Sequence, residues 1–231
     1  MLKKIGTIGA LAMLAGLIFL CRAGAGLLRE GFADARETSG EAAGGENYLI
    51  IIDPGHGGLD AGKVGVNGKE EKEINLNISL KIQKLLKEQG VEVEMTRTED
   101  ERLGETQVED LKARVSLMNE KNPDLVISIH QNSYHEESVS GAQVFYYTDS
   151  AQSERAAEFI QEALKEADPE NTKKTKENST YYILKRTEVP AVIVECGFLS
   201  NRREAEKLAG EEYQQELAAA VVKGTLRYLE D

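Results

Sequence analysis

The sequence predicts an α/β protein with one folded domain, in which helices flank a twisted, mostly parallel sheet. Two observations lead to this class. Short apolar runs bounded by turn residues are typical of buried strands, and they alternate along the chain with longer amphipathic stretches that are typical of helices. This alternation indicates βαβ units, whose parallel strands are covered by helices on both faces of the sheet.

The predicted strands are continuous apolar runs, as expected for strands that are buried on both faces. The runs YLIIID, LVISIH and AVIVE are the clearest, and each of them ends in an ionisable residue. The run YYIL is expected to form a further short strand. In chain order, the expected strands are residues 48–53, 91–96, 125–130, 141–147, 181–184 and 191–195.

The predicted helices have the spacing of a single apolar face. Ile74, Ile78, Ile82 and Leu85 recur at helical intervals, and Gly90 follows them where the C-terminal cap of a helix is expected. The expected helices are residues 71–89, 109–121, 151–167 and 213–229, and residues 165–178 are expected to form a polar surface loop.

The N-terminal region has the pattern of a targeting segment. Lys3 and Lys4 precede an apolar run over residues 5–21, and Ala23-Gly24-Ala25 matches a cleavage site. Residues 1–25 are therefore predicted to be a signal peptide or an uncleaved membrane anchor, since the run is near the lower length limit of a spanning helix. Residues 26–46, which are rich in Gly, Ala and Glu, are predicted to be a flexible linker. The domain at 47–231 is expected to be exported across the cytoplasmic membrane.

The composition excludes several classes of function. The chain of 231 residues has 28 Lys and Arg against 40 Asp and Glu, and its net charge of −12 argues against nucleic acid as a partner. Two cysteines cannot build a disulfide framework or a four-cysteine zinc module. Because there are only three histidines, any histidine-based metal site must use most of them.

Ionisable residues gather where the predicted strands end. His56 follows the first strand in a glycine-rich turn, while His130 and Glu195 end two other strands. The carboxyl ends of parallel strands border one edge of a sheet, so these side chains are expected to converge there, together with Glu71 at the start of the next helix. Two histidines and one or two glutamates suit a catalytic zinc ion, and a nearby carboxylate would then transfer protons.

Simpler interpretations of the single residues remain open at this point. Glu71 could be a charge favoured by the helix dipole, and His130 could be a core histidine with its hydrogen bonds satisfied. His135 is expected to be solvated in a polar loop, and Cys196 to be part of the core. Residues 57–63 match most of a phosphate-binding loop, but the hydroxyl residue that should follow is missing, so that interpretation is rejected.

Six motifs occur in a fixed order along the chain. They are DPGHGG at residues 53–58, Glu71-Lys72, Thr96-Arg97-x-x-Asp100, Arg114, SIHQNS at 128–133 and PAVIVECGFLSN at 190–201. Together they resemble the zinc-dependent N-acetylmuramoyl-L-alanine amidases of the amidase-3 type, over residues 48–231. The resemblance implies that His56, Glu71 and His130 bind zinc and that Glu195 is the catalytic carboxylate. It also implies hydrolysis of the amide between N-acetylmuramic acid and L-alanine.

Within that family the chain resembles the sporulation branch, in part through SGAQVFYY at residues 140–147. Members of this branch remove stem peptides in the spore cortex, which prepares muramic acid for δ-lactam formation. The resemblance implies peptidoglycan as the substrate, and action in the cell wall or the forespore intermembrane space, either secreted or attached to the membrane by the N-terminal segment. Whether a protein partner is needed stays open.

Two other classes of function also stay open, a non-catalytic peptidoglycan-binding module and a zinc carboxypeptidase that acts on the stem peptide. The candidates for contacts in the cleft are Tyr182, Arg186 and Arg97.

Overall fold

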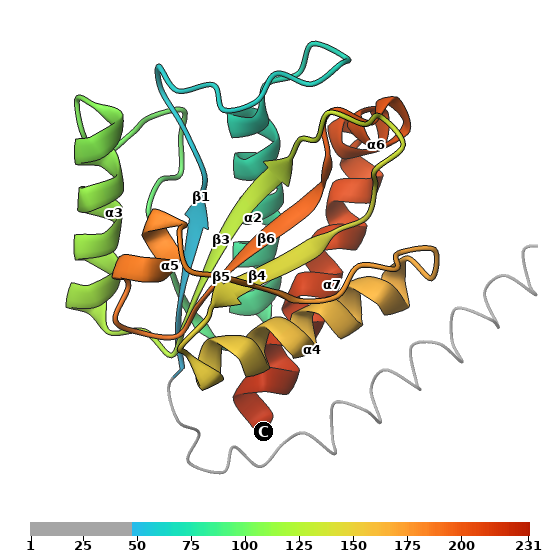
Figure 1. The fold of residues 1–231 in the computed structure, drawn as a ribbon. Coiled ribbons are helices and arrows are strands. Elements are labelled where there is room, and N and C mark those ends of the chain that lie inside the picture. Colours follow the sequence, from blue (N-terminus) through green and yellow to red (C-terminus); the bar gives the residue numbers. More distant parts are fainter. Residues whose placement is uncertain (1–47) are drawn as a thin grey trace, which may run out of the picture. The chain divides into compact units, whose positions relative to one another are not determined.

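The apolar runs of the sequence form one six-stranded sheet in the computed structural model, which describes residues 48–231 (Figure 1). The order across the sheet is β2-β1-β3-β6-β4-β5; the first four of these strands are parallel, and β4 is antiparallel to β6. The prediction of a mostly parallel α/β sheet is therefore confirmed. The strands are β1 (Leu49–Pro54), β2 (Glu92–Met95), β3 (Leu125–Asn132), β4 (Gln143–Tyr147), β5 (Lys176–Asn178) and β6 (Ala191–Phe198).

Helices cover both faces of this sheet (Figure 1). Ile50 and Ile52 of β1 point into a core shared with α2, α4 and α7, whereas Ile51 points into a smaller core shared with α3 and α5. Successive side chains of a strand point to opposite faces of the sheet. Because both faces are covered here, the buried strands are apolar at consecutive positions. The helices are α2 (Glu71–Glu88), α3 (Gln107–Lys121), α4 (Ala151–Ala167), α5 (Tyr182–Arg186), α6 (Arg202–Ala209) and α7 (Glu211–Glu230).

The strand predicted at residues 181–184 is wrong, because this segment forms the short helix α5. Ile183 and Leu184 are both buried against the same small core although they are consecutive. A strand would have directed these two side chains to opposite faces. Four residues are also too few for a helical period to be recognised in the sequence.

Two further elements were not predicted. Helix α6 has a largely charged sequence, but its start is marked by Asn201, whose Oδ1 accepts a hydrogen bond from the Glu204 backbone N–H at 3.0 Å. Strand β5 lies within the predicted polar loop, as a mostly exposed edge strand of three residues. Its sequence, Lys-Glu-Asn, has none of the apolar character by which the other strands were recognised.

The predicted signal peptide or anchor at 1–25 and the predicted linker at 26–46 lie outside the described residues. Within residues 48–231, no helix combines the length and the apolar character needed to cross a membrane.

A buried ion pair ties the end of β1 to α3. Arg114 Nη1 donates to Asp53 Oδ1 at 2.7 Å, and Arg114 Nε donates to Asp110 Oδ2 at 2.8 Å. The hydroxyls of Thr96 and Ser128 also donate to Asp53, each at 2.7 Å. Burial by itself raises the pKa of Asp53, but the Arg114 charge and these hydrogen bonds outweigh it and hold that pKa below its ordinary value. Asp53 is therefore a structural carboxylate that remains ionised.

Two arginines fix the backbone that follows β1. Arg114 donates to the carbonyl oxygens of Pro54 and His56 at 2.8 and 2.7 Å. Arg97 donates to the carbonyl oxygens of Pro54 and Gly55, both at 3.0 Å. Arg97 was a candidate for a contact in the cleft, but its side chain is buried and binds backbone carbonyls instead. Two buried guanidinium groups thus fix the backbone of the loop that carries His56.

Replacing Asp53 should reveal how much the fold depends on this network. Asp53→Asn keeps the shape of the side chain and removes its charge, so we expect the free energy of unfolding to fall by about 3–5 kcal/mol in urea titrations near neutral pH. Because the pKa of folded Asp53 lies below 3.8, its stabilisation is complete above about pH 5 and is lost as the pH falls through the folded pKa. The difference between the two proteins should therefore shrink in acid.

The matched control for this substitution is Glu94→Gln, which breaks a solvent-accessible ion pair with Lys121 of similar length, 2.8 Å. It should cost less than about 1 kcal/mol. Equal losses from the two variants, or a difference that does not change with pH, would contradict the assignment of Asp53.

Candidate active site

The side chains of His56, Glu71 and His130 converge at the carboxyl edge of the sheet. His56 Nε2 lies 3.3 Å from Glu71 Oε1, and His130 Nδ1 lies 3.0 Å from the same oxygen. One potential ligand atom from each residue lies within 4.8 Å of the other two. The residues come from the turn after β1, the first position of α2 and the interior of β3. The predicted convergence of these three residues is therefore observed.

The turn after β1 presents His56 in an unusual backbone conformation. His56 has φ 64°, in the left-handed region that non-glycine residues seldom adopt. Gly55 lies directly beneath the His130 ring, and a Cβ on Gly55 would lie only 2.2 Å from His130 Cε1. The absence of a side chain at Gly55 thus allows the two histidines to approach, with their ring centroids 5.0 Å apart.

Glu71 is a buried carboxylate that is held in place by backbone donors. Its Oε2 accepts a hydrogen bond from the Lys63 backbone N–H at 2.8 Å, and its Oε1 accepts one from the Gln131 backbone N–H at 3.0 Å. Burial opposes ionisation of Glu71, but hydrogen bonds from His130 and His56 outweigh it and hold its pKa far below the usual range. The position of Glu71 at the start of α2 also favours a negative charge.

Asp60 orients His56, and sequence reasoning did not identify this residue. Asp60 Oδ2 lies 2.9 Å from His56 Nδ1, on the opposite side of the ring from Glu71. Burial lowers the pKa of His56, but hydrogen bonds and charge from Glu71 and Asp60 outweigh it and raise that pKa to about 9. A carboxylate on the far nitrogen is the usual way in which proteins fix a metal-binding histidine. The signal in the sequence was an Asp four residues after His56, inside the same glycine-rich loop.

Glu195 lies beside the cluster, directly across from His130 in the register of β6 and β3. Its side chain is 7% exposed, and its Oε2 is buried without a hydrogen-bond partner among the described residues. Burial raises the pKa of Glu195 to about 7, with His130 opposing the shift. A buried carboxylate that lacks a partner is costly, which makes Glu195 a candidate for a chemical role.

The three converging side chains have the chemistry and spacing of a metal site. Two imidazoles and one carboxylate form a donor set that is typical of catalytic zinc. Ligand atoms bound at roughly 2.1 Å to one tetrahedral zinc ion lie roughly 3.4 Å apart. The separations of 3.0 and 3.3 Å between Glu71 Oε1 and the two imidazoles are close to this value, and all three potential ligand atoms lie within 4.8 Å of one another. The residues therefore fit a metal ion of this type.

A cavity of about 310 Å³ opens beside Glu195. Two of the candidate metal ligands, Glu71 and His130, line it together with mostly apolar side chains. Tyr182, a predicted contact residue, lines this cavity, whereas Arg186 is exposed and does not line it. The lining residues are Glu71, Leu111, His130, Gln131, Tyr181, Tyr182, Ile183, Ile193 and Glu195.

Comparison with known proteins identifies the group to which this arrangement belongs. A family model described as N-acetylmuramoyl-L-alanine amidase, Amidase_3, matches residues 50–227. The chain belongs to this amidase family. The resemblance inferred from the six motifs is thereby confirmed.

The amidase has similar relatives of known name and structure. It is 39% identical over 189 residues to the germination-specific N-acetylmuramoyl-L-alanine amidase of Bacillus subtilis, a match that covers 78% of this chain and 79% of the relative. The CwlD amidase from Clostridioides difficile, solved in complex with the GerS lipoprotein, is 36% identical with a TM-score of 0.77. That match covers 80% of this chain and 99% of the other. Similarity to the sporulation branch is thus confirmed as well.

A second solved structure shows that the fold extends beyond that branch. AmiC2 of Nostoc punctiforme is 31% identical, with a TM-score of 0.73 over 80% of this chain and 99% of the other. The cell-wall amidases among the relatives are consistent with action outside the cytoplasm.

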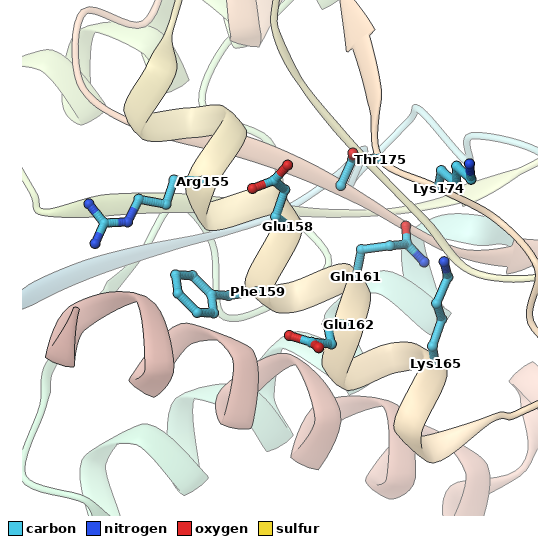
Figure 2. A pocket seen from close by; sticks show the side chains of 8 residues that line it. All are labelled: Arg155, Glu158, Phe159, Gln161, Glu162, Lys165, Lys174 and Thr175. Carbon is cyan, nitrogen blue, oxygen red and sulfur yellow. The ribbon is translucent and has the colours of Figure 1, made fainter.

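Other candidate features of the amidase stand apart from this centre. His135 is exposed and lies 3.5 Å from the exposed Glu136, as expected for a solvated residue. Cys196 is fully buried, and burial raises the pKa of its thiol, so a reactive thiolate is disfavoured. A larger pocket of about 730 Å³ lies along α4 and shares no residue with the candidate metal ligands. Figure 2 shows the side chains that line it. Charges of both signs are mixed in it; its lining residues are Arg155, Glu158, Phe159, Gln161, Glu162, Lys165, Lys174 and Thr175.

A methyl group added at Gly55 should disturb the site without altering any candidate ligand. Because its Cβ would overlap the His130 ring, we expect Gly55→Ala to weaken zinc binding by at least about tenfold in calorimetric titrations of the metal-free protein. The control is Gly68→Ala, where a Cβ meets no atom within 4 Å and only the φ of 80° is strained. This control should lose some stability but bind zinc normally, and unchanged affinity in Gly55→Ala would refute the steric argument.

Removing the charge of Asp60 should also weaken the site through His56. Asp60→Asn is expected to lower zinc affinity by about 10–100-fold, since a hydrogen-bonded carboxylate raises the basicity of a metal-binding imidazole. Glu136→Gln makes the matched change beside the exposed His135 and should have no effect. A similar affinity in both variants would show that Asp60 has no such role.

Proposed function

We propose that this chain is a zinc-dependent N-acetylmuramoyl-L-alanine amidase that cleaves the amide between N-acetylmuramic acid and the L-alanine of the stem peptide. The observation that carries the proposal is Glu195, a buried carboxylate without a partner on Oε2, beside a converging His-Glu-His set in a chain of the amidase family. In this proposal His56, Glu71 and His130 hold the ion.

The ion and the protein supply different parts of the chemistry. Zinc, when bound, polarises the scissile carbonyl and makes a water molecule more acidic. Glu71 neutralises part of the ion's charge, and its backbone donors keep it fixed between the histidines. Asp60 and the carbonyl contacts of Arg114 keep His56 in its strained conformation, so the site does not have to reorganise during the reaction.

Glu195 is proposed to transfer the proton. Hydrolysis of an amide requires a group that takes a proton from the attacking water and gives one to the departing nitrogen. Burial raises the pKa of Glu195 to about 7, where both exchanges are possible near neutral pH. Because Oε2 makes no hydrogen bond to the described part of the protein, it is available for the water and the substrate.

The relatives and the N-terminal pattern support a proposal for the biological setting. The Bacillus subtilis relative is named germination-specific, which supports action on the spore cortex and formation of muramic δ-lactam. Residues 1–25 would direct the domain across the cytoplasmic membrane as a signal peptide or as an anchor. The acidic domain has no charge attraction to a cell wall that carries carboxylates. Its access to the substrate would therefore depend on where the N-terminal segment places it.

The product of the reaction separates this proposal from the alternatives. An amidase releases whole stem peptides with a new L-alanine amino terminus, a carboxypeptidase releases single amino acids, and a binding module releases neither. Mass analysis of purified peptidoglycan treated with the zinc-loaded protein distinguishes the three. Absence of free stem peptides would overturn the proposed activity.

Substitution of Glu195 tests its role in proton transfer. Glu195→Gln should retain zinc and lower amide cleavage by roughly 10²–10⁴-fold, because an amide cannot accept and return the proton. The control is Glu177→Gln, an exposed carboxylate on β5 that should leave the rate unchanged. Near-normal cleavage by the zinc-loaded Glu195→Gln protein would remove Glu195 from the mechanism.

A further inference from the structure

Tyr181 is an aromatic residue of the cavity that sequence reasoning did not select. It precedes α5 and lines the cavity beside Glu195, together with Tyr182, Ile193 and Leu111. Its side chain is 36% exposed, so part of the ring is available to a ligand. Large apolar groups on a surface that borders a catalytic centre are candidates for binding substrate.

The ring of Tyr181 is held in a fixed place. It packs against Phe145, with the ring centroids 5.5 Å apart, and Phe145 is paired with Ile193 in the register of β4 and β6. Asn178 fixes the backbone of the turn, since its Oδ1 accepts hydrogen bonds from the backbone N–H groups of Thr180 and Tyr181, both at 2.8 Å. A ring fixed in this way loses little freedom when a ligand binds.

The position of Glu195 determines which part of the substrate contacts Tyr181 and the other apolar residues that line the cavity. Ile193 and Glu195 are two residues apart in β6, so their side chains point to the same face of the sheet. If Glu195 protonates the departing nitrogen, the residue attached to that nitrogen must lie close to Glu195. In N-acetylmuramoyl-L-alanine that residue is the alanine, whose methyl group would then lie against Ile193 and Tyr181.

The charges in the cavity limit how much of the peptide can enter. Glu71 and Glu195 are both acidic, and the described lining residues include no lysine or arginine. The lining therefore offers no basic side chain that could pair with the carboxylates farther along a stem peptide, whereas a small apolar residue is compatible with it.

We propose that Tyr181 is a specificity-determining residue, whose ring forms with Ile193, Tyr182 and Leu111 an apolar subsite for the small first amino acid of the stem peptide. This inference rests on the proposed amidase function and deepens it. The ring, rather than the phenol hydroxyl, provides the recognition, because apolar contact is what the neighbouring side chains offer.

A comparison of two substrates tests the subsite. Synthetic muramoyl peptides with L-alanine or with glycine as the first residue differ by one methyl group. We expect the zinc-loaded wild-type protein to prefer the alanine substrate by roughly tenfold in kcat/KM, as is usual for one methyl group in an apolar pocket. Tyr181→Ala should reduce this ratio to less than about threefold, mainly by raising KM for the alanine substrate.

Three variants complete the design. Tyr181→Phe should keep the wild-type ratio, since it retains the ring. Tyr181→Leu provides a second truncation of the ring if the alanine variant folds poorly, and it should also lower the ratio. Tyr134→Ala removes another exposed tyrosine, which packs on His135 and does not line the cavity, and should change nothing.

The outcomes separate this inference from the proposed function. Equal losses on both substrates, with the ratio preserved in Tyr181→Ala and Tyr181→Leu, would overturn the subsite and leave the amidase activity intact. If wild-type protein loaded with zinc cleaved neither substrate, the proposed function would fail together with the inference that rests on it. Loss of the ratio in Tyr181→Phe would show that the hydroxyl, and not the ring, is recognised.

Discussion

The buried guanidinium group of Arg114 is the constraint on which the site depends. A guanidinium group has five donors in a rigid plane, and Arg114 uses them for two carboxylates and for the carbonyl oxygens on either side of the turn after β1. Removing this charge from water is costly, and only the complete set of partners offsets the cost. The contact with the His56 carbonyl fixes the backbone at a positive φ, so this network positions the main chain of the candidate metal site, while Asp60 orients the His56 ring.

The buried carboxylates of this domain divide into two kinds according to their partners. Asp53 accepts hydrogen bonds from Arg114, Thr96 and Ser128, and its pKa lies below the ordinary value. Glu195 leaves Oε2 without a partner, and burial raises its pKa to about 7. A buried carboxylate with all its hydrogen bonds stabilises the fold. One that lacks a hydrogen bond raises the free energy of the folded state, and a bound substrate or water molecule can remove this cost. The contrast holds for these two residues only, since Glu71 accepts hydrogen bonds as Asp53 does and is nevertheless a candidate metal ligand.

The apolar runs in the sequence predicted most of the sheet, because a strand covered on both faces must be apolar along its length. They also predicted correctly which strand ends lie close together. It could not predict the direction of individual side chains. Arg97 lies in a family motif but points into the core, and Asp60 and Tyr181 contribute to the site through contacts that no local pattern encodes. The short helix α5 was mistaken for a strand because its few residues are aromatic and aliphatic, and tertiary packing decided their conformation.

The acidic character of the chain is also present locally, in the side chains that line the cavity. A net charge of −12 provides no long-range attraction to a wall polymer that carries carboxylates. Inside the cavity, Glu71 and Glu195 add negative charge where no lysine or arginine of the described lining balances it. His56, Glu71 and His130 would hold a metal ion there, whose charge would offset much of this negative charge. In the proposed subsite, apolar contact with Tyr181, Tyr182 and Ile193 would supply the recognition that the charges of the lining do not supply.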